Sequence, residues 1–162
     1  MTKADVKADN GMIHSISDVL YPIPENDLVD TLIADERFST LVTAATAAGL
    51  VDTLRTTDLT IFAPTNDAFA KVPKDALGAL LADKEALTAV LLRHAVPGSL
   101  FSKGITWMEH KTAGGEMVAT QVFKMGVVKV VSYSNDKRAG ARVVEADIIS
   151  SNGVIHAIDT VI

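Results

Sequence analysis

Histidine offers the widest range of chemistry in this chain, because imidazole can bind a metal, act as a base or donate a proton near neutral pH. The four histidines are His14, His94, His110 and His156. A zinc site usually needs two histidines at a short spacing, such as H-x-H or H-E-x-x-H. No pair in this sequence has such a spacing, so we expect no metal site and no cofactor.

Candidate nucleophiles are equally scattered. The chain has no cysteine, which excludes thiolate catalysis, disulfides and cysteine-ligated zinc. None of Ser99, Ser102 and Ser132 stands in the G-x-S-x-G turn that exposes a serine nucleophile. No base lies at an ordered spacing from them either. We therefore expect a protein that is not an enzyme.

Two of the histidines lie in patterns that favour a structural role. His94 continues the apolar face of a predicted helix, and a buried histidine needs a hydrogen-bond partner. We expect its side chain to bond a backbone group or hydroxyl near Pro64 or Thr65. His156 alternates with apolar residues in a predicted strand and is expected to be half-buried. The alternative is that His94 serves as a ligand or base in a pocket.

Composition indicates one globular domain without covalent cross-links. The 162 residues are 48% hydrophobic, which is sufficient for a core. The formal net charge of −5 argues against a nucleic-acid partner, which requires clustered Lys and Arg. No run of 18 apolar residues exists, so no segment is expected to span a membrane.

One local basic cluster is formed by Lys137, Arg138 and Arg142. It lies at the end of a predicted hairpin, where such residues are commonly solvated. It is also a candidate for weak contact with an anion or a sulfated glycan.

Hydrophobic periodicity predicts helices in the first half of the chain and strands in the second. Helical spacing covers residues 27–36, 38–48, 75–82 and 84–95, with a short helix after 65–67. Gly49 is a suitable C-terminal cap. Strand patterns cover residues 59–62, 117–123, 127–133, 141–149 and 154–161. Helices and strands that are segregated in this way indicate an α+β fold.

The sequence contains an internal repeat that joins residues 5–20 to residues 147–162 without gaps. Asp5, Asn10, Gly11, Ile13, His14, Ile16 and Val19 match Asp147, Asn152, Gly153, Ile155, His156, Ile158 and Val161. The offset of 142 residues, from Asn10 to Asn152, is a domain length. We therefore predict that 1–21 are the closing strand of a preceding repeat, 22–27 a linker and 28–162 a complete domain. The alternative is two similar strands within one domain.

Three segments resemble the signature blocks of the fasciclin domain. They are residues 60–69 (TIFAPTNDAF), 91–98 (LLRHAVPG) and 152–159 (NGVIHAID), which occur in the family's order. Residues 1–21 resemble the closing block of a preceding unit. The residues that carry the signature are Thr60, Phe62, Ala63, Pro64, Thr65, Asn66, Phe69, His94, Pro97, Gly98, Asn152, Gly153, Ile155, His156 and Asp159.

The resemblance implies a β-wedge of two sheets with helices packed around it. It also implies adhesion at the cell surface or in the extracellular matrix, through a matrix or cell-surface protein, a glycan or neighbouring fasciclin domains. It supplies no catalytic residue. The family often has Tyr before the central His, where this chain has Arg93. Arg93 is therefore a possible binding residue that cannot supply the aromatic contact linked to integrin recognition in the family.

The sequence is compatible with three functions. The first is an extracellular adhesion or matrix-binding module without catalysis. The second is a small-ligand-binding or weakly hydrolytic domain with a pocket near His94. The third is a structural spacer in an array of repeats. Residues 1–10 are polar, so a secretion signal or anchor is expected outside this sequence.

Overall fold

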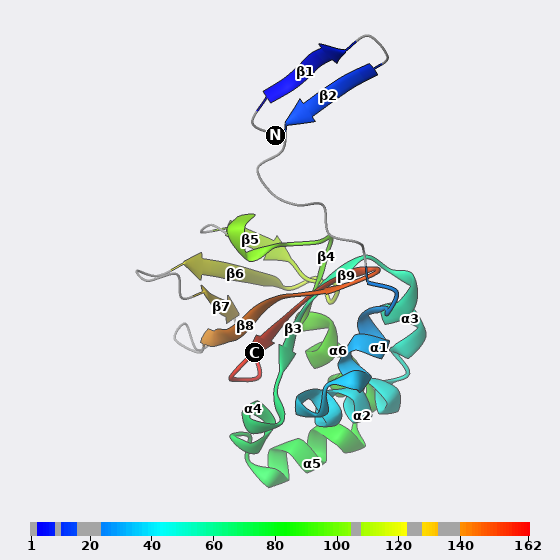
Figure 1. The fold of residues 1–162 in the computed structure, drawn as a ribbon. Coiled ribbons are helices and arrows are strands. Elements are labelled where there is room, and N and C mark those ends of the chain that lie inside the picture. Colours follow the sequence, from blue (N-terminus) through cyan, green and yellow to red (C-terminus); the bar gives the residue numbers. More distant parts are fainter. Residues whose placement is uncertain (1–2, 9–10, 16–23, 105–107, 123–127, 133–139) are drawn as a thin grey trace.

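The computed structural model describes residues 3–8, 11–15, 24–104, 108–122, 128–132 and 140–162. In this part of the chain, every α-helix ends at or before Arg93, and most strands follow residue 107. The predicted α+β class, with helices in the N-terminal half, is therefore confirmed (Figure 1). The helices are α1 (Leu28–Ala34), α2 (Ser39–Ala48), α3 (Val51–Thr56), α4 (Asn66–Ala70), α5 (Lys74–Ala82) and α6 (Lys84–Arg93), with 3-10 turns η1 (Glu36–Phe38) and η2 (Ser102–Gly104).

The helix ends follow from local residue chemistry. Gly49 ends α2 with a left-handed φ of 75°, and the Leu50 N–H donates to the Ala45 carbonyl at 3.0 Å, as predicted for a glycine cap. The Thr65 side chain caps α4. The helix predicted to reach Ala95 ends earlier, because residues 95–97 form a strand. None of the helices in the described ranges is long and apolar enough to cross a membrane.

Seven strands form one mixed sheet in the order β4-β3-β9-β8-β7-β6-β5, and β1 pairs with β2 in a separate hairpin. β3 and β9 run parallel, and the other neighbouring strands are antiparallel. The strands are β1 (Lys3–Ala8), β2 (Gly11–Ser15), β3 (Leu59–Pro64), β4 (Ala95–Pro97), β5 (Met108–Lys111), β6 (Met117–Val122), β7 (Val128–Ser132), β8 (Gly140–Ser150) and β9 (Gly153–Ile158).

The two sheets expected for a β-wedge share the long strand β8. Its first residues, 140–142, pair with β7, whereas residues 143–150 pair with β9. Two register irregularities interrupt the β8–β9 pairing on either side of Glu145. Such bulges bend a strand and increase its twist. β8 therefore joins a β3–β4–β9 half, where the helices gather, to a β5–β7 half that extends away from them (Figure 1).

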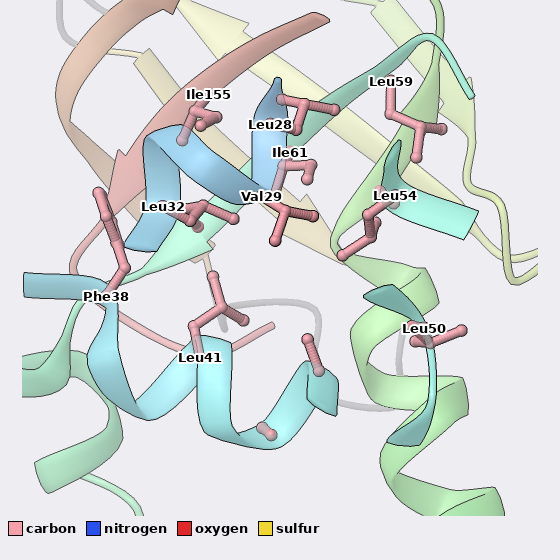
Figure 2. Close-up of a cluster of buried hydrophobic side chains, with 14 of the residues drawn as sticks. Leu28, Val29, Leu32, Phe38, Leu41, Leu50, Leu54, Leu59, Ile61 and Ile155 are labelled. Carbon is pink, nitrogen blue, oxygen red and sulfur yellow. The ribbon is translucent and has the colours of Figure 1, made fainter. Parts of the chain in front are cut away.

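β3 and β9 are buried on both faces. Ile61 and Ile155 belong to the cluster that packs against the helices, while Phe62 and Ile158 belong to a second cluster with β6–β8. Figure 2 shows the first cluster, with Leu28, Leu32 and Leu41 of the helices directed toward these strands. His156 is fully buried in this central strand, so the expectation of a half-buried residue was wrong.

Asn152 connects the start of β9 to two helices. Its Oδ1 accepts the Leu28 N–H at the start of α1 at 2.8 Å. Its Nδ2 donates to the carbonyls of Leu54 at 2.8 Å and Arg55 at 3.0 Å, near the end of α3. Helix ends leave such backbone groups without intrahelical partners. One side chain therefore satisfies groups at the ends of both helices and places β9 against them.

Asn152→Ala should lower the free energy of unfolding by about 2–4 kcal/mol, since it leaves several half-buried backbone groups without partners. Urea denaturation followed by circular dichroism measures the change. Asn26→Ala is the matched control, because Asn26 is exposed and its substitution should cost less than about 0.5 kcal/mol. Equal effects of the two substitutions would contradict the role assigned to Asn152.

Candidate functional site

A surface groove of about 670 Å³ lies where η1, α4, β8 and the end of β9 meet. Signature residues Thr65, Asn66 and Asp159 contribute to it, together with Arg142 of the predicted basic cluster. Its other lining residues are Glu36, Arg37, Asp67, Lys71 and Val144. Three cations and three carboxylates therefore line the groove, and their formal charges cancel.

Asp159 holds the β9 side of the groove. Its Oδ1 accepts the Arg142 N–H at 2.9 Å, and its own N–H donates to the Arg142 carbonyl at 3.1 Å. Its carbonyl accepts the Lys71 Nζ at 2.6 Å. Burial alone would raise the pKa of the Asp159 carboxyl, but the hydrogen bonds from Arg142 and Thr160 and the nearby Lys71 charge hold it below its usual value. Asp159 is therefore an anion at neutral pH.

Arg37 also lines the groove. Its guanidinium donates to the Glu145 carboxylate at 2.6 Å and to the Asp35 carboxylate at 2.6 Å, and it lies 5.6 Å from the centre of the Phe38 ring. The hydrogen bonds that Arg37 donates to Asp35 and Glu145 raise its pKa. These paired charges are fixed in direction, which favours a ligand with hydrogen-bonding groups at matching positions over a diffuse polyanion.

Asn66, which also lines the groove, holds neighbouring elements in place. Its Nδ2 donates to the Glu36 carbonyl at 2.9 Å, and its Oδ1 accepts the Thr40 N–H at 3.0 Å. The amide therefore holds η1 and the start of α2 beside α4. Because its oxygen and nitrogen are both engaged within the chain, Asn66 shapes the groove without presenting a free amide to a ligand.

His94 is buried and bonded through both ring nitrogens. Nδ1 lies 2.7 Å from the Val90 carbonyl, and Nε2 accepts the Ile162 N–H at 3.0 Å. The expected side-chain bond near Pro64 or Thr65 was wrong, since the contact between these blocks is made by the main chain, where the Phe62 N–H donates to the His94 carbonyl at 2.9 Å. Burial lowers the pKa of His94 to about 4, so the ring is neutral at pH 7.

The space beside His94 is small and apolar. It measures about 30 Å³ and is lined by aliphatic residues such as Leu41, Leu54 and Leu91. Pockets for small organic ligands typically measure 300–1,000 Å³. A volume about tenfold below the lower end of that range does not accommodate a substrate, so the pocket required by the ligand-binding alternative is not formed at His94.

Ser102, Asp147 and His156 lie in one hydrogen-bond network. The Asp147 carboxylate accepts the Ser102 N–H at 2.7 Å and also its hydroxyl. The His156 Nδ1 accepts the Asp147 N–H at 3.2 Å, and Nε2 lies 2.8 Å from the Leu100 carbonyl. A catalytic triad needs the histidine between the carboxylate and the serine. This order instead ties η2 to β8 and β9.

Several other signature side chains are also bonded or packed. Thr60 Oγ1 donates to the Gly98 carbonyl at 2.6 Å and accepts the Leu100 N–H at 2.8 Å. Gly98 itself has a φ of 90°, which favours glycine. Ala63 and Phe69 lie in the main hydrophobic cluster. The described part of the chain brings together no group of three His, Asp or Glu side chains suited to a metal ion.

Arg93 and Arg142, the two predicted binding residues that the structure describes, do not share a site. Arg93 is paired with the Glu116 carboxylate, with its Nη2 2.9 Å from Oε1. Lys137 and Arg138 lie outside the described residues. Arg142 lines the groove together with Arg37 and Lys71. Neither Arg37 nor Lys71 was among the binding residues predicted from the sequence. Arg37 carries no local signal of a site, because Lys71, Arg142 and Asp159, which line the groove with it, are far away in the sequence.

Comparisons with known proteins agree on one family. The fasciclin-domain family model matches residues 36–162. Protein sll1483 of Synechocystis is 41% identical over 138 residues, which cover 83% of this chain and 72% of that protein. Human periostin is 32% identical over 164 residues, which cover 98% of this chain and 18% of periostin.

A solved structure has the same fold. The FAS1 domain pair from the insect cell adhesion molecule Fasciclin I superposes with a TM-score of 0.71 at 20% identity, covering 98% of this chain and 57% of that one. The match in fold, the family model and the identity to a relative of similar length agree. This chain belongs to the fasciclin family.

Proposed function

We propose that this chain is an extracellular adhesion or matrix-binding module that works by binding and without catalysis. This proposal rests on a contrast between the buried and the exposed polar side chains of the chain. The buried signature side chains of Thr60, His94 and His156 are engaged in internal hydrogen bonds, whereas Lys71 and Arg142 present charge along an open groove. A scaffold of this kind can bind a partner but offers no unengaged acid, base or nucleophile among those side chains.

The groove supports a macromolecular partner. It is open, it is lined by Arg37 and Asp159, which take part in ion pairs, and it includes Val144, a residue that is 48% exposed. Exposed apolar groups next to satisfied charges are typical of protein interfaces with a polar rim. We expect the partner to be a cell-surface or matrix protein, a glycan, or a neighbouring fasciclin domain. We accordingly propose that the protein lies at the cell surface or in the extracellular matrix. We also propose that this domain is one of several fasciclin domains in a tandem array.

Binding should be tested on the groove itself. We expect Lys71→Ala/Arg142→Ala to weaken binding by about tenfold or more, since both cations would be removed from a site rich in directed charge. The measurement is surface plasmon resonance against immobilised collagen, fibronectin and heparin.

The matched control removes the same charge elsewhere. Lys103→Ala/Lys111→Ala changes two exposed lysines outside the groove and should leave binding unchanged. Thermal unfolding of both variants checks that the fold is retained. Equal affinity of both variants for every bound partner would exclude the groove, and no binding by the parent chain would favour the spacer function.

Acid should destabilise the fold through its neutral histidines. The folded-state pKa of His94 is about 4 against an ordinary value of 6.5, so the unfolded chain binds more protons in this window. The free energy of unfolding should therefore fall as pH decreases from about 6.5 to about 4, by roughly 3 kcal/mol from His94. Burial also lowers the pKa of His156, which adds to the fall in the same direction.

Urea denaturation between pH 7 and pH 4.5 measures this slope. This range lies above the pKa of the carboxylates that are lowered by hydrogen bonding and nearby charge, such as Asp35 and Asp159. His94→Gln keeps a donor and an acceptor but cannot titrate, so it should flatten the slope. His110→Gln, at a less buried position, should flatten it less. A stability that is independent of pH would refute the structural role of the histidines.

A further inference from the structure

The N-terminal hairpin has the same strand pairing as the hairpin that closes the domain. In β1–β2, Ala8 faces Gly11; in β8–β9, Ser150 faces Gly153, 142 residues later. The next pairs also correspond at this offset. They are Lys7 with Met12, Val6 with Ile13 and Lys3 with Ser15, against Ile149 with Val154, Ile148 with Ile155 and Glu145 with Ala157. The register irregularity of β1–β2, between Lys3 and Val6, also falls at the same step as one of the two in β8–β9.

The repeated residues are those that attach β8–β9 to the rest of the domain. Asp147 accepts from Ser102, Asn152 joins α1 and α3, and His156 bonds the Leu100 carbonyl. The residues at the corresponding N-terminal positions are Asp5, Asn10 and His14. The residues shared by the two hairpins are therefore those through which β8–β9 contacts the rest of the domain. A general preference for strand formation would not select them.

Two of the buried apolar positions show the same selection. Ile155 and Ile158 are fully buried, one in each hydrophobic cluster, and isoleucine occurs at both matching positions, 13 and 16. Ile149, by contrast, is 41% exposed, and its counterpart is Lys7. Identity is kept at these buried positions and lost at the exposed one.

Gly153 is the most demanding of the shared positions. A Cβ on this residue would lie 1.9 Å from the Leu59 carbonyl oxygen, far inside van der Waals contact. Only glycine lets β9 approach the start of β3 at this point. The N-terminal hairpin has Gly11 at the equivalent place, so it meets this steric requirement.

We propose that the N-terminal hairpin, residues 3–15, can close the sheet of its own chain by replacing the end of β8 and β9. β9 has the better fit, because Ala157 is fully buried where the N-terminal hairpin has Ser15, and Ser150 donates to the Gly153 carbonyl where it has Ala8. We therefore expect the N-terminal hairpin to replace β9 only when a substitution destabilises β9 in its own position. This exchange does not depend on what the groove binds.

The chain is long enough for this exchange within one molecule. A docked residue 16 would lie at the far end of β9, and the chain must return to Leu28, which is bonded to Asn152 at the near end. The six residues of β9 span about 20 Å, whereas the 11 residues from Ser17 to Asp27 can span about 36 Å. A tether of this length also favours its own chain over a second copy at low protein concentration.

A double-mutant cycle on the two glycines tests the proposal in the full chain. Gly153→Ala should lower the midpoint of thermal unfolding by about 10 °C while a cooperative transition remains, because the N-terminal hairpin replaces β9. Hydrogen exchange of that variant should show increased protection of residues 11–15 and decreased protection of residues 153–158. Gly11→Ala alone should leave the midpoint unchanged, but in the Gly153→Ala background it should abolish the cooperative transition.

Gly78→Ala is the control for the glycine substitutions, since a Cβ at position 78 meets nothing within 4 Å, and it should not couple to Gly153→Ala. Identical unfolding of Gly153→Ala and Gly11→Ala/Gly153→Ala would overturn the proposal. So would rescue that requires increasing protein concentration and yields dimers by light scattering, because that result assigns the hairpin to a second copy.

Discussion

The central constraint on this fold is that β9 is enclosed on every side. Both faces of the strand are buried, and it pairs with β3 along one edge and with β8 along the other. A polar group in such a position costs free energy unless it finds a partner inside the protein. The signature residues on and beside β9 supply these partners, which explains why polar residues are found at the centre of an aliphatic core.

The same constraint explains the chemistry of the two buried histidines. Each ring has one nitrogen that accepts a backbone N–H and another beside a backbone carbonyl, so each is complete as a neutral tautomer. Protonation would direct a second N–H at a donor, and burial opposes the added charge as well. A histidine in this position joins two segments with the directionality of an amide, and its basicity is suppressed by the fold that it stabilises.

Local signals in the sequence were sufficient for most elements. The Gly49 cap and the apolar periodicity of α6 depend on neighbouring residues, and the structure confirms them. The six-residue helix α3 and the three-residue strand β4 were missed. Their apolar patterns are too short to be distinguished from loops, and β4 exists because β3 offers it an edge.

The candidate site was less predictable because it depends on tertiary contacts. Its charged residues come from η1, α4, β8 and the end of β9. Asn66 and Asp159 bond backbone groups that hold these elements together, so they have little freedom to change without loss of stability. The Lys71 and Arg142 side chains reach into the groove from its exposed edge, where substitutions cost little. Partner choice in a groove built this way should therefore depend on the charged edge, while the signature residues keep its shape.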